Sequence, residues 1–340
     1  SNNILLIILM YIKLTNNKNF KRDKKFYQIA IKTLKKIKKK IVPLKLIITK
    51  SNSTKIVIAD DTKQLQGSYK FRGANSEIQN IKDRNIKTIC LGSTGNFGLS
   101  MSYLCKKNKI DCNIFISKNT NIYKIENLRK NNSILHQNNK NYDDAKMNAK
   151  KFAAKNNYKF QDVCTKSIFY GNASFVLEII EKLKKKDKNL LKKKILAVFP
   201  LGSGSLATPS IKILKYLSPQ IKIAVVEPER FSKFFYIFDK RKKPSFLPTI
   251  AEGAGVKKIP KINYKYLLDN VDIVSKVSEN EIKNAIKFLY KKYKIKAEGA
   301  GALSMSLFLK LNKSFSNFDY IILPICGTNI DKKSFSKIIS

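Results

Sequence analysis

Residues 195–217 read ILAVFPLGSGSLATPSIKILKYL, which sets out a strand, a glycine-containing loop and a helix in turn. The apolar run 195–199 predicts a buried strand. Residues 202–205 predict a loop, and Pro209 suits the first turn of the following helix. The same order recurs as strand 88–91, loop 92–95 and helix 97–108. Because strands and helices alternate along the chain, we predict an α/β fold with mainly parallel sheets flanked by helices.

The length of 340 residues and a hydrophobic content of 43% suit two packed lobes. No repeat and no Pro- or Ser-rich linker divides the chain, so we expect the lobes to be interleaved.

The apolar run 4–11 is far shorter than the ~20 residues of a membrane span, and we expect it to pack on the body as a strand or helix. Further strands are predicted at 112–117, 221–226 and 320–325, and further helices at 120–130, 142–156, 169–185, 279–293 and 302–310.

Glycine is scarce and clustered in this chain. The sequence has 13 glycines, whereas average usage would give roughly 24. Most of them fall in groups near residues 67–73, 92–98, 202–204, 253–255 and 299–301, with a further one at 327. Ordinary turns and helix caps would explain any single group. Several groups that follow predicted strands indicate backbone that approaches a ligand, because ligands in α/β sheets bind beyond the carboxyl ends of the strands.

The formal charge of +44 is usually a sign of a nucleic-acid partner. Only six of the 68 basic residues are Arg, however, and the lysines are spread over almost every segment. Since base recognition favours the planar guanidinium of Arg, we interpret the lysines as solvent-facing substitutions. We predict no specific nucleic-acid partner, although a polyanion-binding protein on a decayed enzyme scaffold remains the alternative from another class.

Cysteine and histidine usage limits the chemistry further. The five cysteines form no CxxC pair, and His136 is the one histidine. We therefore expect no metal site, no Ser/His or Cys/His nucleophile system, and a reducing, cytoplasmic location. His136 is expected at the surface or on an edge strand.

Two short segments carry candidate chemistry. The loop 202–205 resembles an anion cradle, in which backbone N–H groups and a helix N-terminus bind phosphate, although a plain strand-to-helix turn is an equally good interpretation. Lys70 lies in the segment GSYKFRGA (67–74), between two glycines and beside Tyr69 and Phe71. We expect this partly apolar setting to lower the pKa of the Lys70 amine, as Schiff-base chemistry requires.

The order of these segments resembles the threonine and serine dehydratases, which belong to the β-family (fold type II) of pyridoxal phosphate enzymes. The resemblance spans residues 42–329. It rests on SYKFRGA (68–74), STGNFG (93–98), GSGSL (202–206), EG (252–253), EGAGA (298–302) and CGTN (326–329). It implies a two-lobed fold, with a large cofactor-binding lobe formed by residues 1–62 and 168–340 and a small lobe formed by residues 63–167.

The resemblance also implies roles for individual residues. Lys70 would hold pyridoxal 5′-phosphate as a Schiff base and move the α-proton of the substrate. Asn96 would contact the 3′ oxygen of the cofactor, Cys326 its pyridine nitrogen, and Glu298 would lie near the ring or be an ordinary helix-entry carboxylate. The phosphate would be bound by Gly202, Ser203, Gly204, Ser205 and Leu206. The substrate would be held by Ser68, Ser93, Thr94 and Gly95.

The implied reaction is the deamination of L-threonine to 2-oxobutanoate and ammonia by β-elimination, a step in isoleucine biosynthesis. L-serine dehydratase, serine racemase and threonine synthase are the alternatives within the fold, and a homo-oligomer is expected. Because 11 residues follow Asn329, we expect no C-terminal regulatory domain and no inhibition by isoleucine through one. The sequence departs from the family at the serines of loop 202–206, at Phe97 in place of a common His, and at residues 59–61.

Overall fold

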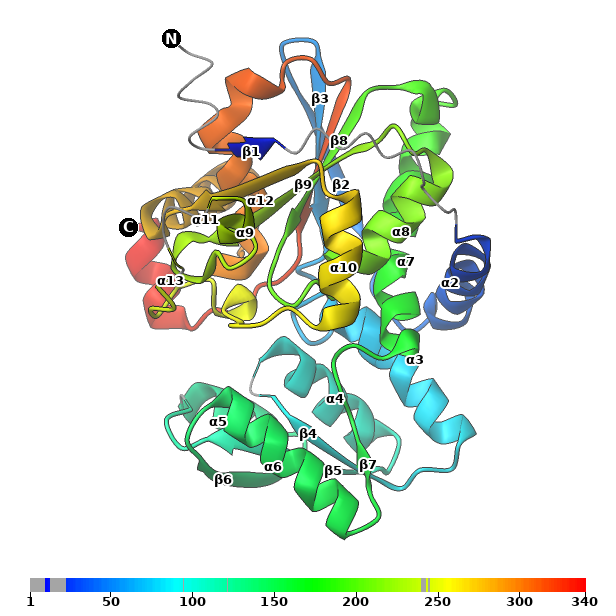
Figure 1. Ribbon diagram of the computed structural model, residues 1–340, viewed down its shortest axis with the longest axis vertical. Helices are drawn as coiled ribbons and strands as arrows, with labels where there is room; N and C mark the ends of the chain where they lie inside the picture. Colours follow the sequence, from blue (N-terminus) through cyan, green and yellow to red (C-terminus); the bar gives the residue numbers. More distant parts are fainter. Residues whose placement is uncertain (1–9, 13–22, 94, 121, 240–242, 244) are drawn as a thin grey trace.

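The structure is a computed structural model that describes residues 10–12, 23–93, 95–120, 122–239, 243 and 245–340. Two sheets, each flanked by helices, form an upper and a lower body in Figure 1. We call these bodies the large lobe, built on the seven-stranded sheet, and the small lobe, built on the four-stranded sheet. The predicted α/β fold with mainly parallel sheets is confirmed.

The large sheet has the strand order β1-β10-β9-β8-β11-β3-β2. Its inner strands pair in parallel, and β1 and β2 pair antiparallel at the two edges. The strands are β1 (Met10–Ile12), β2 (Lys45–Ser51), β3 (Thr54–Asp60), β8 (Ile195–Pro200), β9 (Lys222–Pro228), β10 (Ile273–Val277) and β11 (Tyr320–Ile325).

Both faces of the large sheet are buried, as the continuous apolar runs of its inner strands require. Consecutive side chains of β8 alternate between two cores: Ala197 joins the core under the helices α2 (Lys24–Ile37), α7 (Lys166–Lys186) and α8 (Ala207–Leu217), whereas Val198 joins the opposite one. That opposite core packs under α11 (Glu279–Tyr293) and α12 (Gly299–Leu311). The sheet is therefore a rigid central layer from which loops project at one edge.

The small sheet has the order β6-β5-β4-β7, and all its strands are parallel. The strands are β4 (Thr88–Gly92), β5 (Asp111–Ser117), β6 (Ile134–Asn139) and β7 (Lys159–Phe160). His136 lies on the edge strand β6, as expected, and its ring stacks on Phe115 at 4.2 Å.

The helices of the small lobe are α4 (Asn96–Lys107), α5 (Ile122–Arg129) and α6 (Tyr142–Lys155). The helix α3 (Lys70–Asp83) packs against α7 at the junction of the two bodies in Figure 1. The remaining α-helices of the described chain are α9 (Phe235–Phe238), α10 (Lys261–Asn270) and α13 (Lys332–Ile339), and its short 3₁₀ helices are η1 (Leu190–Lys192), η2 (Glu229–Phe231), η3 (Glu252–Ala254) and η4 (Asn312–Phe315).

The expectations for the chain ends and the lobe boundaries have mixed outcomes. Of the apolar run 4–11, residues 4–9 lie outside the described residues, whereas Met10–Ile12 forms β1. The lobe boundaries near residues 62 and 167 stay a prediction.

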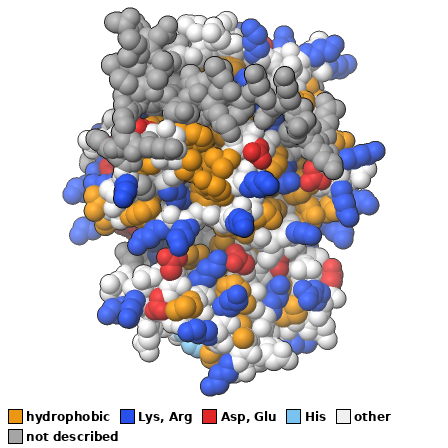
Figure 2. All heavy atoms as spheres, viewed as in Figure 1, with side chains coloured by type: hydrophobic (Ala, Val, Ile, Leu, Met, Phe, Trp, Pro, Cys, Tyr) orange, Lys and Arg blue, Asp and Glu red, His pale blue; other side chains and the backbone are white. Residues whose placement is uncertain are grey.

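None of the helices described combines the length and apolar character that crossing a membrane requires. Figure 2 shows Lys and Arg side chains dispersed over the visible face of both lobes, which agrees with the interpretation of the lysines as solvent-facing substitutions.

Candidate active site

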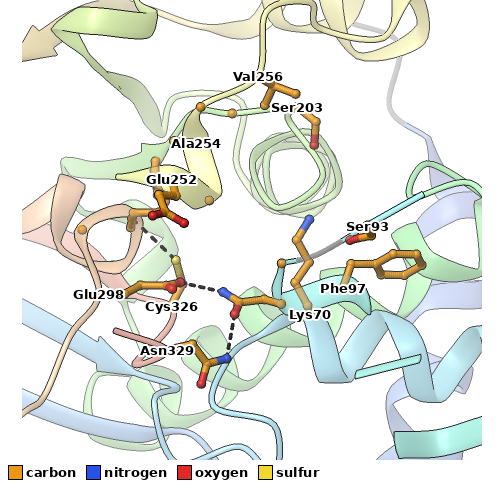
Figure 3. Close-up of a pocket in the computed structure, with 18 of the residues that line it drawn as sticks. Lys70, Ser93, Phe97, Ser203, Glu252, Ala254, Val256, Glu298, Cys326 and Asn329 are labelled. Atoms are coloured by element: carbon orange, nitrogen blue, oxygen red, sulfur yellow. Dashed lines mark hydrogen bonds between the residues drawn. The ribbon is translucent and has the colours of Figure 1, made fainter. Parts of the chain in front are cut away.

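A cavity of about 390 Å³ lies between the two lobes, within the roughly 300–1,000 Å³ of typical ligand sites. Loops at the carboxyl ends of strands from both sheets line it, as expected for parallel α/β sheets. In Figure 3, Lys70 extends into the middle of this space, with Cys326 and Glu298 on one side and Ser93 on the other. The cavity brings together most of the residues that the sequence singled out: Lys70, Ser93, Gly95, Asn96, Gly202, Ser203, Gly204, Ser205, Leu206, Glu298 and Cys326.

Lys70 is the first residue of α3, and hydrogen bonds between two loops place it there. The Tyr69 N–H donates to the Cys326 carbonyl at 3.0 Å, and the Thr328 N–H donates to the Gly67 carbonyl at 2.8 Å. Gly67 has a φ of +68°, a left-handed conformation that glycine adopts without strain. The loop before Lys70 is therefore tied to the loop after β11, which carries Cys326.

A buried ion network fixes the first turn of α3. Arg72 is fully buried, and its guanidinium donates two hydrogen bonds of 2.7 Å to the Asp61 carboxylate. It also contacts Glu178 on α7 at 2.5 Å. The sequence suggested only that residues 59–61 depart from a family pattern, whereas the structure shows that Asp61 anchors the helix that begins with Lys70.

The amine of Lys70 has no carboxylate partner within ion-pair distance in the part of the chain that the structure describes. Its Nζ donates to Ser205 Oγ at 2.5 Å. Burial alone lowers the pKa of this amine, but the nearby Tyr69 hydroxyl, followed by Cys164 and Tyr142, raises it above its ordinary value. The expected lowering of the Lys70 pKa is therefore wrong: the sequence places Tyr69 beside Lys70, but the expectation counts it only as part of an apolar setting, and Cys164 and Tyr142 are near only in the fold.

Loop 202–206, between β8 and α8, has the structure of an anion cradle. Two amide side chains hold its carbonyl groups: Asn263 donates to the Ser203 oxygen at 2.7 Å, and Asn172 donates to the Ser205 oxygen at 2.8 Å. Gly204 has a φ of +81°, which a larger residue would adopt only with strain. Among the described residues, the N–H groups of 202–206 donate to no backbone carbonyl. They are thus available to an anion at the N-terminus of α8.

A chain of amides joins the lobes at the other side of the cavity. Asn329 donates to Asn96 Oδ1 at 2.6 Å, and Asn96 Nδ2 donates to Glu298 Oε1 at 2.6 Å. Burial raises the pKa of Glu298 to about 7, although the Asn96 hydrogen bond and Lys124 oppose this effect. Lys124 on α5 also pairs with Glu252 in η3, which makes a second contact between the lobes at the cavity.

Cys326 lies at the floor of the cavity and is buried. Burial, followed by the nearby Glu298, raises the pKa of its thiol far above the ordinary range. Cys326 is therefore a neutral thiol at physiological pH, and its Sγ lies 4.0 Å from the Ala300 carbonyl oxygen.

The predicted substrate residues are only partly brought together. Ser93 and Gly95 line the cavity, and the Ser93 hydroxyl accepts a 3.2 Å hydrogen bond from the Gly98 N–H. Thr94 lies outside the described residues. Ser68 does not line the cavity, because its backbone pairs with Gly327 and its fully buried hydroxyl points into the protein. Direct contact of Ser68 with a substrate is therefore not supported. Phe97 lines the wall and is buried.

Comparison with known proteins identifies this type of site. Residues 38–327 match the model of the pyridoxal-phosphate dependent enzyme family. The chain belongs to this family. Its cofactor is therefore pyridoxal phosphate, and its fold is the fold type II of these enzymes.

Individual relatives are more distant. The chain is 27% identical over 301 residues to the catabolic L-threonine dehydratase TdcB of Staphylococcus aureus (strain N315), which covers 86% of this chain and 83% of the relative. The processed threonine deaminase isoform 2 of Solanum lycopersicum has a TM-score of 0.80 at 19% identity, covering 97% of this chain and 90% of the other. Serine racemase from Dictyostelium discoideum has a TM-score of 0.77 at 21% identity, covering 90% and 98% respectively.

The described residues fit this cofactor. The cradle at 202–206 offers unpaired N–H groups to a phosphate, and Gly202 leaves room for the neighbouring loop, since a Cβ there would lie 2.9 Å from Ala254 Cα. The Lys70 amine lies at the cradle, beside Ser205. Cys326 lies across the cavity from Lys70 in Figure 3, and Asn96 lines the same cavity with its amide bonded to Glu298, so both can meet the ring of the cofactor.

Proposed function

We propose that this protein is an ammonia-lyase that deaminates L-threonine to 2-oxobutanoate and ammonia by β-elimination. The observation that carries the proposal is the cavity, where the Lys70 amine faces the phosphate cradle while a neutral thiol and the Asn96 amide lie opposite. The similarity to the S. aureus threonine dehydratase supports the choice of substrate. L-serine is the second candidate, because it differs from threonine by one methyl group.

Pyridoxal phosphate, when bound, withdraws electrons from the α-carbon of an amino acid and so makes the α-proton acidic. We assign the binding of its phosphate to Gly202, Ser203, Gly204, Ser205 and Leu206. Asn96 would contact the ring oxygen, and its amide orientation is fixed by Glu298 and Asn329. Cys326 would contact the ring nitrogen as a neutral group, which would leave the ring less cationic than a carboxylate there would.

Lys70 is the base that we assign to the α-proton. Its amine lies in the cavity, hydrogen-bonded to Ser205 and within ion-pair distance of no carboxylate among the described residues. The Ser93 hydroxyl and the backbone from Ser93 to Gly95 are assigned to the carboxylate of the substrate. The contacts Asn96–Glu298 and Lys124–Glu252 join the two lobes beside the cavity.

A direct assay tests the substrate assignment. The protein saturated with pyridoxal phosphate is incubated with L-threonine or L-serine, and the oxo acid is measured with a coupled dehydrogenase. Release of 2-oxobutanoate with a higher kcat/KM than that of pyruvate supports threonine dehydratase. Chiral chromatography of the serine reaction detects D-serine, and D-serine as the major product would assign a racemase instead.

The polyanion alternative predicts different results. A decayed scaffold would bind RNA tightly and in a salt-sensitive manner, and it would release no oxo acid from either amino acid. The cavity geometry favours the enzyme, because a decayed site would not need to keep Lys70, the cradle and Cys326 around one space. Cytoplasmic location and a homo-oligomeric state stay predictions.

A further inference from the structure

Three side chains meet at the cradle end of the cavity. Lys70 Nζ donates to Ser205 Oγ at 2.5 Å, and the Tyr69 hydroxyl lies 3.0 Å from the same oxygen. Tyr69 and Ser205 are buried, and Lys70 Nζ lies 5.1 Å from the centre of the Tyr69 ring. The hydroxyl of Ser205, at a position where the related family usually has glycine, therefore connects two side chains that are adjacent in sequence.

The chemistry of these groups allows two hydrogen-bond directions. A charged Lys70 ammonium can only donate hydrogen bonds. Ser205 Oγ therefore accepts a hydrogen bond from it and donates its own O–H to the Tyr69 oxygen. A neutral Lys70 amine has a lone pair, so Ser205 can donate to Nζ while Tyr69 donates to Ser205. Each of the three groups has a partner in both arrangements. A glycine at 205 would leave the Lys70 amine and the buried Tyr69 hydroxyl without this partner.

We propose that Ser205 and Tyr69 are positioning residues that hold the Lys70 amine in both of its charge states, by reversing the direction of the two hydrogen bonds that link them. The inference rests on the proposed function, in which Lys70 takes up and returns a proton. It adds to that function a reason why the amine keeps one position while its charge changes.

The titratable groups around Lys70 come from several elements. Burial lowers the pKa of the amine, and Tyr69, Cys164 before α7 and Tyr142 on α6 raise it. Burial raises the pKa of the Tyr69 hydroxyl, and Lys70 opposes this. Glu298 and Cys326 also face the amine, and the positive charge of Lys70 lowers the pKa of each. Tyr69 is the largest of the effects that raise the Lys70 pKa, so we expect removal of its hydroxyl to lower that pKa.

The test uses Ser205→Ala and Tyr69→Phe in the cofactor-loaded enzyme. We expect each to lower kcat on the order of tenfold with little change in KM, because an orienting contact acts on the chemical step. The kcat of the double variant is expected to be no lower than that of the poorer single variant, since both changes break the same pair of linked hydrogen bonds. Ser306→Ala and Tyr170→Phe are the matched controls. They remove a buried and a half-buried hydroxyl outside the cavity and should leave kcat unchanged.

A second measurement does not depend on catalysis. The full chain is freed of cofactor with hydroxylamine, and the rate of amine modification at Lys70 is followed against pH by mass spectrometry of the Lys70 peptide. Tyr69→Phe should move the midpoint of this curve to lower pH, whereas Tyr170→Phe should not move it. Ser205→Ala should make the amine more reactive at any given pH.

The outcomes separate the two proposals. If borohydride reduction of the loaded enzyme marks a lysine other than Lys70, the proposed function fails. If it marks Lys70 but both variants keep the kcat and the Lys70 midpoint of the unaltered protein, the positioning role of Ser205 and Tyr69 alone is wrong. Additive losses in the double variant would also overturn that role. Should Ser205→Ala fail to fold, Tyr69→Phe tests the same linked hydrogen bonds from the Tyr69 side.

Discussion

Asn96 Nδ2, at the start of α4, donates a 2.6 Å hydrogen bond to Oε1 of Glu298, immediately before α12. This bond joins a loop of the small lobe to a loop of the large lobe across the cavity. Asn96 can donate to Glu298 whether the carboxyl is protonated or ionised. The charge of Glu298 therefore changes the stability of the junction without removing its hydrogen bond.

The raised pKa of Glu298 predicts a pH dependence of stability. Because the native state keeps the proton up to about pH 7, against an ordinary pKa of 4.5, the folded protein binds more protons than the unfolded chain between these values. The contribution of Glu298 is therefore fully present below pH 4.5 and is lost as the pH rises through 7, by about 1.4 kcal/mol per pH unit and at most about 3 kcal/mol. Urea unfolding at pH 5, 6, 7 and 8 measures this loss. Glu298→Gln should lack it, and parallel curves for the two proteins would refute the assignment.

Two glutamates on α7 offer a matched comparison of buried and exposed ion pairs. Glu178 contacts the buried Arg72, whereas Glu181 pairs with Lys185 on the surface. Glu178→Gln should lower the free energy of unfolding on the order of 1–3 kcal/mol, because it weakens a desolvated charged contact. Glu181→Gln should change it by less than about 1 kcal/mol. Chemical unfolding measures both, and equal effects would show that the Arg72 network does not anchor α3.

The amide of Asn263 is predicted to shape the phosphate cradle. Asn263→Ala removes the hydrogen bond to the Ser203 carbonyl, so the loop loses a contact that fixes its backbone. We expect the affinity for pyridoxal phosphate to fall about tenfold, which corresponds to about 1.4 kcal/mol. Absorbance titration of the cofactor measures it. Asn270→Ala on the same helix, where the amide donates to the Tyr266 carbonyl, is the control. A similar loss of affinity in both variants would indicate general destabilisation of α10.

The strand, glycine loop and helix units were predictable because each is written in contiguous residues. The units β4–α4 and β8–α8 follow the apolar runs and glycines of 88–108 and 195–217. The antiparallel pair β2 and β3 was not predicted, although 54–60 contains the β-branched run IVI (56–58). Strand pairing depends on partners distant in sequence, and short apolar runs do not distinguish an edge strand from a loop.

The supporting residues of the site could not be found in the sequence. Asn172 and Asn263 hold the phosphate cradle, but single asparagines in an Asn-rich chain carry no local signal. Asp61 follows β3 whereas Arg72 lies in α3, so no local sequence pattern pairs them. The pKa of Lys70 depends first on burial and on Tyr69, and then on Cys164 and Tyr142, and of these only Tyr69 is near it in sequence. The motifs identify groups for chemistry, whereas their orientation depends on tertiary contacts.

The most direct test of the central claim is the location of the cofactor-bearing lysine. The protein is loaded with pyridoxal phosphate, its visible absorbance is recorded, and it is reduced with borohydride, digested and mapped by mass spectrometry. The account predicts a phosphopyridoxyl group on Lys70 alone among the 62 lysines, and no such group in Lys70→Ala. Labelling of a different lysine, or no stoichiometric label at any lysine, would contradict it.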